Sequence, residues 1–342
     1  MQKQSILFVY VNYSSFVKAD FEILSTFASV TKYQFKPGKG LINTGLKLLK
    51  QFSFLLVNIW RYDTVFIWFA DYHTLLPVII AKLLGKKSFV VIGGYEVGRI
   101  KNLNYGVLCS KLRGFFCITS IRLCTLNLTV SNYIDRKIKY IAPKSKRQLI
   151  HNCVDFVPLP YSGTEKENLI LTVGLIENQR SFFLKGIDTF IEVARKLPDY
   201  QFIIIGLDNM KLSALLTNIP VNITIFGRVA HEELPGYYIR SKFYCQLSRS
   251  ESFGVSVAEA MFYGCIPIVT NEGGLPELVG ELGYIVSRNP YNISQLISEN
   301  SLILPELQVA VSNRILSGFS REKRKEKLVK VVSNSTNIKI IN

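Results

Sequence analysis

Residues 244–259 read YCQLSRSESFGVSVAE, and the elements around this stretch predict the fold. The apolar run at 243–247 has the length of a strand. Residues 255–262 are apolar enough to form a buried helix, and residues 266–270 form a second strand before Gly273-Gly274 interrupts the chain. A strand, a helix and a further strand in this order indicate an α/β fold with a parallel sheet.

The start of the predicted helix is a candidate anion site. Its unpaired backbone N–H groups and its positive dipole end attract a phosphate, and Gly254 lets a ligand approach the backbone closely. Glu251 and Glu259 place a carboxylate on either side, and carboxylates accept hydrogen bonds from hydroxyls. A nucleotide-sugar combines both chemistries. The alternative is that Glu251 only complements the helix dipole and Glu259 is solvated.

Three segments of this region together resemble a known signature. Residues 251–260 (ESFGVSVAEA), 264–269 (GCIPIV) and 273–277 (GGLPE) resemble the E-x7-E donor site of glycosyltransferase family 4. The likeness is dense over residues 244–279 and weaker across the rest of the second half. It implies a retaining enzyme of GT-B architecture, with two Rossmann-like α/β domains whose parallel sheets face a cleft.

The resemblance also implies roles for individual residues. Glu251 would hold sugar hydroxyls as a catalytic residue, Glu259 would hold the ribose, and Lys185 would neutralise the diphosphate and act catalytically. Leu175 stands where the family usually has Arg, and Arg180 is the expected substitute. The alternative is that Lys185 and Arg180 are ordinary surface residues without a role in donor binding. The full expected donor-binding set is Gly174, Arg180, Lys185, Gly227, Arg228, Glu251, Phe253, Gly254, Val255, Glu259, Gly273, Gly274 and Leu275.

The loop that contains Gly227 and Arg228 follows a predicted strand at 221–226 and is expected to flank the base of the donor. The family commonly contacts the base through the backbone of this loop, so a role for the Arg228 side chain stays open. We find no acidic pair in the sequence that would select uracil over guanine. UDP- and GDP-linked donors are therefore both retained.

The composition limits the class of protein. The chain has 342 residues, 48% of them hydrophobic, which is enough for two domains with sizeable cores. Its 6 Cys include no C-x-x-C pair and its 3 His form no cluster, so we expect free thiols in a reducing cytoplasm and no metal or other cofactor. The apolar run at 6–11 is too short for a signal peptide, and no run reaches the roughly 18 to 20 residues of a membrane span.

The positive charge is concentrated in the first half of the chain. Residues 1–158 contain 22 Lys and Arg against 7 Asp and Glu, whereas residues 159–342 contain 19 against 18. Breakers near 158–163 predict a linker there, so we assign 1–158 to an acceptor-binding domain and 159–342 to the nucleotide-sugar domain. The concentrated charge indicates an anionic partner, although a generic solubility charge is the alternative.

Two loops of the first half are expected at the acceptor side of the cleft. Asp71-Tyr72-His73 follows a predicted strand at 64–69, and Gly93-Gly94-Tyr95-Glu96 follows one at 88–92. His73 and Glu96 are therefore candidate catalytic residues. The alternatives are a capping or packing role for His73 and a salt bridge to Arg99 for Glu96. The family often carries a His at the second loop; here it is missing, and His73 is the neighbour that could replace it.

Basic amphipathic segments at 41–61 and 104–124 are either sheet-covering helices or elements that bind an anionic membrane surface. A basic helix predicted at 320–332 would cross back to the first domain in a GT-B enzyme, or else present a solvated face. Many relatives act on lipid-linked acceptors, so the resemblance implies the same acceptor class here.

The sequence thus predicts a cytoplasmic hexosyltransferase, peripheral to the inner face of the membrane, that serves bacterial cell-surface polysaccharide or lipopolysaccharide synthesis. It would move a sugar from UDP or GDP to a glycan or polyprenyl-linked acceptor. The alternatives are a GT-B nucleotide-sugar epimerase or hydrolase and, on charge alone, a nucleic-acid-binding protein. The chain shows no nucleic-acid recognition motif, so nucleic acid is not expected as a partner. The sugar, the acceptor and the linkage stay open.

Overall fold

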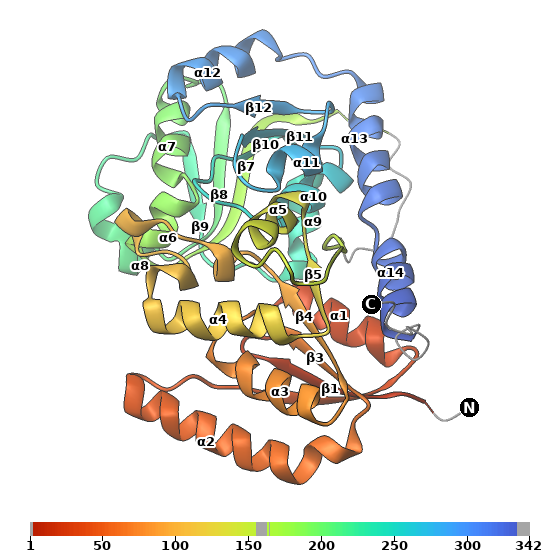
Figure 1. Cartoon of the computed structure of the whole chain (residues 1–342). Coiled ribbons are helices and arrows are strands. Elements are labelled where there is room, and N and C mark those ends of the chain that lie inside the picture. Colours follow the sequence, from red (N-terminus) through yellow and green to blue (C-terminus); the bar gives the residue numbers. More distant parts are fainter. Residues whose placement is uncertain (1–2, 155–162, 164, 334–342) are drawn as a thin grey trace. The chain divides into compact units, whose positions relative to one another are not determined.

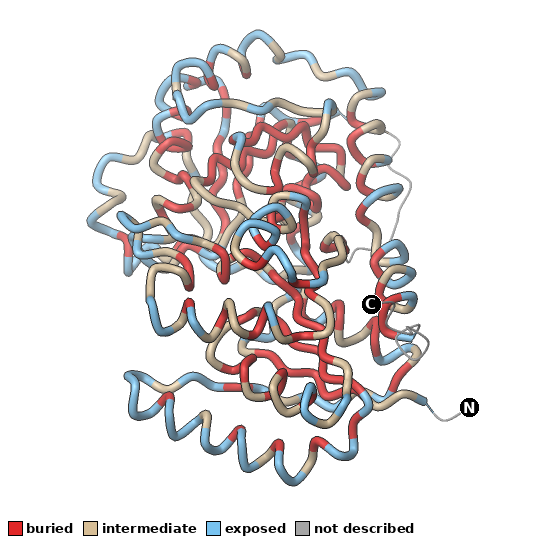
Figure 2. Tube along the Cα trace, in the orientation of Figure 1, coloured by how far each residue is buried: buried red, intermediate tan, exposed pale blue. Residues whose placement is uncertain are grey.

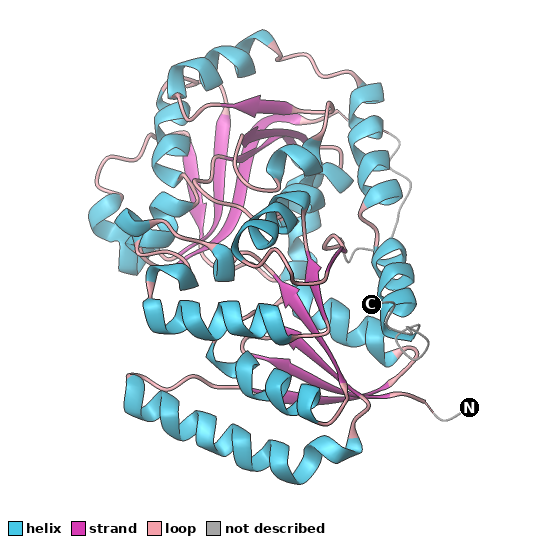
Figure 3. Ribbon diagram, viewed as in Figure 1, coloured by secondary structure: helices cyan, strands magenta, loops and turns pink. Residues whose placement is uncertain are grey.

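The computed structural model describes residues 3–154, 163 and 165–333. The chain divides into two compact units, Met1–Asp155 with Arg321–Asn342 and Phe156–Ser320 (Figure 1). Each unit is a six-stranded parallel sheet with helices, so the predicted α/β class with two Rossmann-like domains is confirmed (Figure 3). The predicted boundary between residues 158 and 159 lies outside the described residues.

The sheet of the first unit has the strand order β2-β1-β3-β4-β5-β6. Its strands are β1 (Ser5–Tyr10), β2 (Ser29–Gln34), β3 (Thr64–Trp68), β4 (Lys87–Ile92), β5 (Leu126–Thr129) and β6 (Arg147–Leu149). The central strands β1, β3 and β4 are buried along almost their whole length. Continuous burial of this kind is typical of a parallel sheet covered on both faces.

Helices cover both faces of this sheet. They are α1 (Ser15–Ser25), α2 (Leu41–Asn58), α3 (Tyr72–Leu83), α4 (Lys111–Leu123) and α5 (Asn132–Ile141), with short 3-10 turns at Ile59–Arg61, Tyr95–Val97, Lys101–Leu103 and Val107–Cys109. The chain moves toward one edge of the sheet from β1 to β2 and toward the other edge from β2 onward. Because crossovers between parallel strands are right-handed, α1 lies on one face of the sheet and α2, α3 and α4 lie on the other. The single helix predicted at 104–124 is instead one such turn, Val107–Cys109, followed by α4, because Ser110 caps α4 at its N-terminus.

The terminal helix α14 (Arg321–Ser333) belongs to the first unit, whereas our division gave residues 159–342 to the second. Arg324 is buried and donates to both carboxylate oxygens of Asp20 in α1, with an Nη2–Oδ2 distance of 2.7 Å. Trp68 Nε1 donates to the same carboxylate at 3.0 Å. This buried ion pair fixes α14 beside α1 and is the physical reason for the difference.

The sheet of the second unit has the strand order β12-β11-β10-β7-β8-β9. Its strands are β7 (Glu167–Ile176), β8 (Gln201–Leu207), β9 (Ile223–Phe226), β10 (Ser241–Gln246), β11 (Ile266–Thr270) and β12 (Tyr284–Val286). Its α-helices are α6 (Gln179–Leu184), α7 (Ile187–Arg195), α8 (Asn209–Leu212), α9 (Leu234–Arg240), α10 (Val255–Phe262), α11 (Leu275–Val279), α12 (Pro290–Glu299) and α13 (Pro305–Gly318), with 3-10 turns at Ser213–Leu215 and His231–Glu233.

The buried residues are concentrated in the strands of the two sheets, and Figure 2 shows these strands beside helices that are only partly buried. The six cysteines are free thiols; five are buried and Cys109 is half-buried. Within the described ranges, no helix combines the length and the apolar composition needed to cross a membrane.

Candidate functional site

The second unit changes its winding direction between two adjacent strands. The chain runs from β7 through β8 to β9 toward one edge of the sheet, and from β10 through β11 to β12 toward the other. Ligands of open parallel sheets bind outside the carboxyl ends of the strands at such a switch point. The segments that follow β7 and β10 therefore form the candidate ligand site of this unit.

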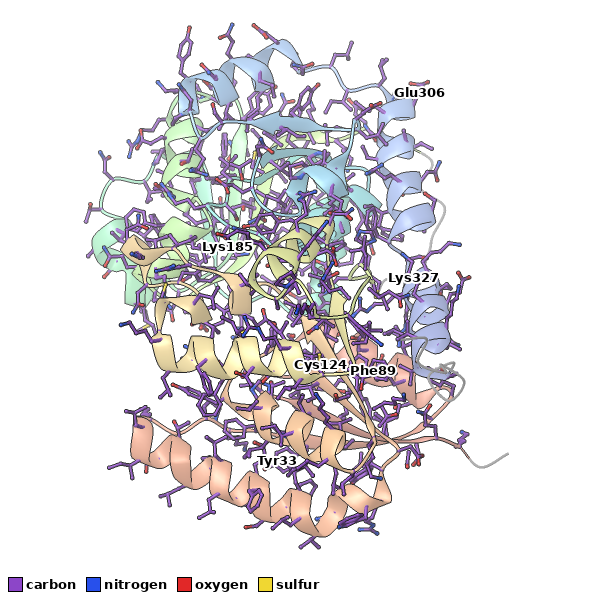
Figure 4. The ribbon with its side chains drawn as sticks, in the orientation of Figure 1. Tyr33, Phe89, Cys124, Lys185, Glu306 and Lys327 are labelled. Carbon is purple, nitrogen blue, oxygen red and sulfur yellow. The ribbon has the colours of Figure 1, made fainter. Side chains whose placement is uncertain are left out.

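These two segments carry Lys185 and Glu251, which the structure brings into contact. Lys185 ends α6, which Asn178 caps at its N-terminus, and Figure 4 labels its side chain. Lys185 Nζ donates to Glu251 Oε2 at 2.8 Å, with side chains 28% and 17% exposed. The other carboxylate oxygen, Oε1, accepts the N–H of Ser252 at 3.1 Å. A cation and a carboxylate predicted for the diphosphate and for the sugar thus lie side by side at the switch point.

Two glycines allow the surrounding loops to approach this pair. Gly186 has φ +72°, and a Cβ there would lie 1.9 Å from the carbonyl oxygen of Leu247. Gly273 has φ +66°, and a Cβ there would lie 1.6 Å from the carbonyl oxygen of Glu251. Gly274 N–H donates to that same oxygen at 3.0 Å. Only glycine fits such approaches, so the predicted Gly-Gly turn is attached to the backbone of Glu251.

An ion pair that we did not predict joins the two loops. Arg249 donates to both carboxylate oxygens of Asp188 in α7, at 2.8 and 2.6 Å, and also to the carbonyl of Phe183. Its backbone N–H donates to the carbonyl of Leu184 at 2.8 Å. A bidentate Arg–carboxylate pair fixes geometry as well as charge, so Arg249 holds the Lys185 loop against the Glu251 loop. Each residue alone has an ordinary sequence context, which gave no signal of the pairing.

Glu259 lies in the middle of α10 and is almost fully buried. One of its oxygens pairs with His231 Nε2 at 3.0 Å, and the other accepts the hydroxyl of Tyr238 at 2.9 Å. The alternative of a solvated Glu259 is therefore wrong. Each carboxylate oxygen accepts more than one hydrogen bond, so a ribose hydroxyl could share this group.

The remaining predicted donor residues lie near these elements. Gly254 precedes α10, Phe253 is buried against Phe319, and Val255 begins the helix. Leu275 begins α11 and is buried. Gly174 lies within β7, close to the point where the register with β8 is irregular. Arg180 is exposed on α6.

A cavity of about 260 Å³ lies at the carboxyl ends of β7, β8 and β9. Gly227 and Arg228, which the sequence predicted beside the base of the donor, line it. Arg228 pairs with Glu177 at 3.3 Å, and Asp208 lines the same cavity. Glu177 and Asp208 are far apart in the sequence, so the sequence gave no indication of two carboxylates in one cavity.

A larger cavity of about 530 Å³ belongs to the first unit. Residues that follow β1, β2, β3 and β4 line it, among them Asn12, Phe35, Asp71 and Glu96. The strand order of this unit also reverses, between β1 and β3, so the cavity again lies at a switch point. The two loops predicted to work together, 71–73 and 93–96, do lie together here.

Glu96 is a buried carboxyl group held by backbone amides rather than by Arg99. It accepts N–H groups from Gly93 at 3.0 Å, Gly94 at 2.6 Å and Ala70 at 3.4 Å. Burial raises the pKa of Glu96 from 4.5 to about 7, and the amides oppose this shift only in part. The group therefore changes its charge near neutral pH.

His73 is buried in α3, and its ring stacks on Phe35. Nε2 lies 2.9 Å from the carbonyl oxygen of Trp68, so this nitrogen must donate and Nδ1 carries the lone pair. Burial lowers the pKa of His73, which keeps the ring neutral. The contacts satisfy the packing role that was the alternative for this residue, and leave Nδ1 as its basic atom.

Arg113 supplies a cation at this cavity, although we did not predict it. It donates to both oxygens of Asp71, through Nε at 3.1 Å and through Nη2, and to the hydroxyl of Tyr95 at 3.2 Å. Phe69, at the end of β3, has φ +69°, which is uncommon for an aromatic residue. Gly93 allows this geometry, because a Cβ there would lie 2.4 Å from the Phe69 ring.

The comparison with protein families identifies the second unit. Residues 162–304 match the family model described as Glycosyl transferases group 1. These residues form a glycosyl transferases group 1 domain. The Lys185–Glu251 pair and the cavity beside Arg228 both lie within it.

Two curated relatives extend this result. The chain is 25% identical over 198 residues to 2-deoxystreptamine N-acetyl-D-glucosaminyltransferase of Niallia circulans, covering 54% of this chain and 51% of the relative. It is 23% identical over 286 residues to a phosphatidylinositol N-acetylglucosaminyltransferase component of Arabidopsis thaliana, covering 72% and 62%. The chain thus spans less than two thirds of the length of either relative.

Solved structures show the fold. Sucrose-phosphate synthase from Thermosynechococcus elongatus superposes with a TM-score of 0.78 at 15% identity, covering 98% of this chain and 99% of that one. HepE from Anabaena, in complex with UDP, gives a TM-score of 0.74 at 14% identity, covering 97% and 100%. The group 1 domain is therefore the second half of a GT-B fold, as the resemblance implied.

Proposed function

We propose that the chain is a retaining hexosyltransferase that moves a sugar from UDP or GDP to a glycan or polyprenyl-linked acceptor. The observation that carries this proposal is the Lys185–Glu251 pair at the switch point of β7 and β10, inside a group 1 domain. Two relatives named as N-acetylglucosaminyltransferases and a structural neighbour that holds UDP support a sugar-nucleotide donor.

The donor diphosphate replaces Glu251 as the partner of Lys185. In the free protein Lys185 Nζ lies 2.8 Å from Glu251 Oε2. A phosphate oxygen that takes the place of Oε2 accepts the same charge-assisted hydrogen bond from Lys185. Arg180 and the amides at 253–254 add further positive potential as charge grows on the leaving phosphate. Displaced from Lys185, Glu251 accepts hydrogen bonds from the sugar, Glu259 accepts the ribose hydroxyls, and no metal ion or other cofactor takes part.

Retention follows from attack on the face that the diphosphate leaves. The bond between the anomeric carbon and the β-phosphate oxygen breaks while the acceptor oxygen bonds to the same carbon. The departing phosphate oxygen takes the proton of the acceptor hydroxyl, so no enzyme nucleophile is needed.

The cavity of the first unit is the proposed acceptor site. Arg113 and Glu96 give it polar groups, and Phe35 and Phe69 give it apolar walls. This combination suits a sugar attached to a hydrocarbon carrier. The name of the Arabidopsis relative also specifies a lipid acceptor. We place the reaction in cell-surface polysaccharide synthesis at the cytoplasmic face of the membrane.

The test uses purified chain with UDP- and GDP-sugars labelled in the sugar, with and without an extract of polyprenyl-linked glycans. Transfer of label to the extract, with the donor configuration retained by NMR, is the expected result. Free sugar or an epimer formed from donor alone would show the hydrolase or epimerase instead. If neither nucleoside diphosphate raises the melting temperature, the donor site is wrong.

A further inference from the structure

The helix α2 exposes most of its large apolar residues and buries two polar ones. Its buried residues are Thr44, Gln51 and Leu55, of which two are polar. Seven of its ten large apolar side chains and the following Trp60 are instead 38–83% exposed, whereas Leu48 and Phe54 are half-buried; the exposed residues are Leu41, Ile42, Leu46, Leu49, Phe52, Leu56, Val57 and Trp60. A helix that only covers a sheet shows the opposite distribution, with its apolar stripe facing the core. Figure 2 shows α2 exposed along most of its length.

The exposed residues form one continuous face. At about 100° per residue, the eight side chains occupy an arc of roughly 160°, in which Ser53 is a small polar member. Lys50 follows at the edge of this arc, and Lys47 lies about 80° beyond it. The helix α4, the other basic segment considered from the sequence, differs: its exposed large apolar residues are Leu112 and Phe115. The apolar face is therefore a property of α2 rather than of the basic half in general.

The charge around this face has one sign. Between Ile23 and Tyr62 the sequence contains six cations and no Asp or Glu, the cations being Lys32, Lys36, Lys39, Lys47, Lys50 and Arg61. A broad apolar face bordered by cations alone is the pattern of a helix that lies in the interface of an anionic bilayer. A surface for an acidic protein would need the cations but not eight exposed apolar side chains.

We infer that α2 docks the first unit onto an anionic lipid bilayer, with its apolar face below the headgroups and its lysines among them. The segment that leads into α2 also borders the larger cavity, since Pro37, Gly38 and Thr44 line it. Thr44, in the first turn of α2, joins the two by donating to the carbonyl of Gly38 at 3.1 Å. If the proposed transferase function holds, docking by α2 brings this cavity to the membrane surface, where a polyprenyl-linked acceptor resides.

The two tryptophans of the chain make a direct assay possible. Trp60 is 65% exposed beside α2, whereas Trp68 is fully buried in β3. Vesicles of equimolar phosphatidylcholine and phosphatidylglycerol should therefore shift the fluorescence of Trp60 to the blue and sediment the protein. Added salt should weaken both effects. Trp60→Phe should abolish the fluorescence shift and leave sedimentation largely in place.

A triple variant tests the apolar face. Leu46→Ser, Leu49→Ser and Leu56→Ser together should lower vesicle partitioning at least about a hundredfold, because each leucine contributes by leaving water. The matched control is Leu302→Ser with Leu304→Ser, two exposed leucines of the second unit, which should partition like the wild type. Circular dichroism and the thermal shift with UDP or GDP report on the fold and on the donor site separately from docking.

Equal partitioning of the triple variant and the wild type would overturn the inference, as would a wild-type protein that ignores these vesicles. Sedimentation velocity without lipid identifies the rival occupant, a second copy of the chain. A dimer that the triple variant dissociates, with no vesicle binding, would assign the face to self-association. Vesicle binding without any nucleotide-induced thermal shift would retain the docking and remove the proposed donor site.

Discussion

Replacing Glu251 by Gln should tighten the binding of UDP or GDP while it slows sugar transfer. In the free protein Glu251 competes for Lys185, at 2.8 Å. Both side chains are partly exposed, so the pair contributes about 0.2–1 kcal/mol. Gln lacks the charge, and the released lysine should therefore bind a diphosphate up to about fivefold more tightly.

The effect on the reaction has the opposite sign. The sugar loses a charged acceptor for its hydroxyls, and hydrogen bonds to charged groups contribute about 1.5–3 kcal/mol. A loss of this size in the transition state lowers kcat/KM by about 10- to 100-fold. Removing the side chain altogether, in Glu251→Ala, should abolish transfer, while the fold persists because the residue lies in a turn.

Calorimetric titration with UDP and with GDP measures the first effect, and initial rates with the labelled donor measure the second. The matched control is Glu192→Gln, which removes the carboxylate of another partly exposed pair, with Arg195 at 3.1 Å, on α7. Lys185→Ala should weaken nucleotide binding. A tenfold weaker affinity of Glu251→Gln for the nucleoside diphosphate would refute the competition, since it would make Glu251 a ligand of the nucleotide itself.

Three further outcomes are expected. Arg324→Met should lower the free energy of unfolding in urea by about 3–5 kcal/mol, because it leaves the Asp20 carboxylate buried without its cation. Adding Asp20→Asn to this variant should restore part of the loss. No restoration would show that the unpaired carboxylate is not the cause. Because the pKa of Glu96 is raised from 4.5 to about 7, the folded state holds a proton that the unfolded state has released between these pH values. The free energy of unfolding should therefore fall by up to about 3 kcal/mol as the pH rises from about 4.5 to about 7. Glu96→Gln should lack this fall. EDTA should leave the transfer rate unchanged, because Lys185 rather than a metal ion neutralises the diphosphate in the proposed mechanism. A rate that is lost in EDTA and restored by one divalent cation would assign this neutralisation to the metal ion instead.

The sequence predicted the elements whose signals are local. The strands at 64–68 and 266–270 are continuous apolar runs, and the start of α10 follows from Gly254 and the apolar run after it. The edge strand β2 was missed because its side chains are mostly exposed and include Lys32, so it lacks a buried pattern. Periodicity identifies an element by its buried face, and an edge strand has little of one.

Pairings between distant residues could not be predicted in the same way. Arg249 and Asp188 are 61 residues apart, and Arg324 and Asp20 are 304 apart, yet each pair decides where a segment lies. Nothing in the composition of either neighbourhood selects the partner. The cavity of the first unit could not be predicted for the same reason, because segments after four strands and Arg113 of α4 line it and no single stretch of sequence contains its pattern.

The Lys185–Glu251 pair has a consequence for how the donor site is built. A site that kept an unpaired lysine for the diphosphate would lack, before the ligand arrived, the contribution of about 0.2–1 kcal/mol that a partly exposed ion pair makes to stability. In the proposed donor site the carboxylate neutralises the lysine until the diphosphate replaces it, and the hydrogen bond from Gly274 N–H to the Glu251 carbonyl oxygen would hold the Glu251 backbone in place. On this proposal, binding would exchange one ion pair for another and would turn the carboxylate toward the sugar. Gly273→Ala, which would bring a Cβ to 1.6 Å from the Glu251 carbonyl oxygen, should disturb this exchange, so that nucleotide affinity and transfer rate fall together. A variant that binds UDP and GDP normally but transfers no sugar would show that the turn positions the sugar alone.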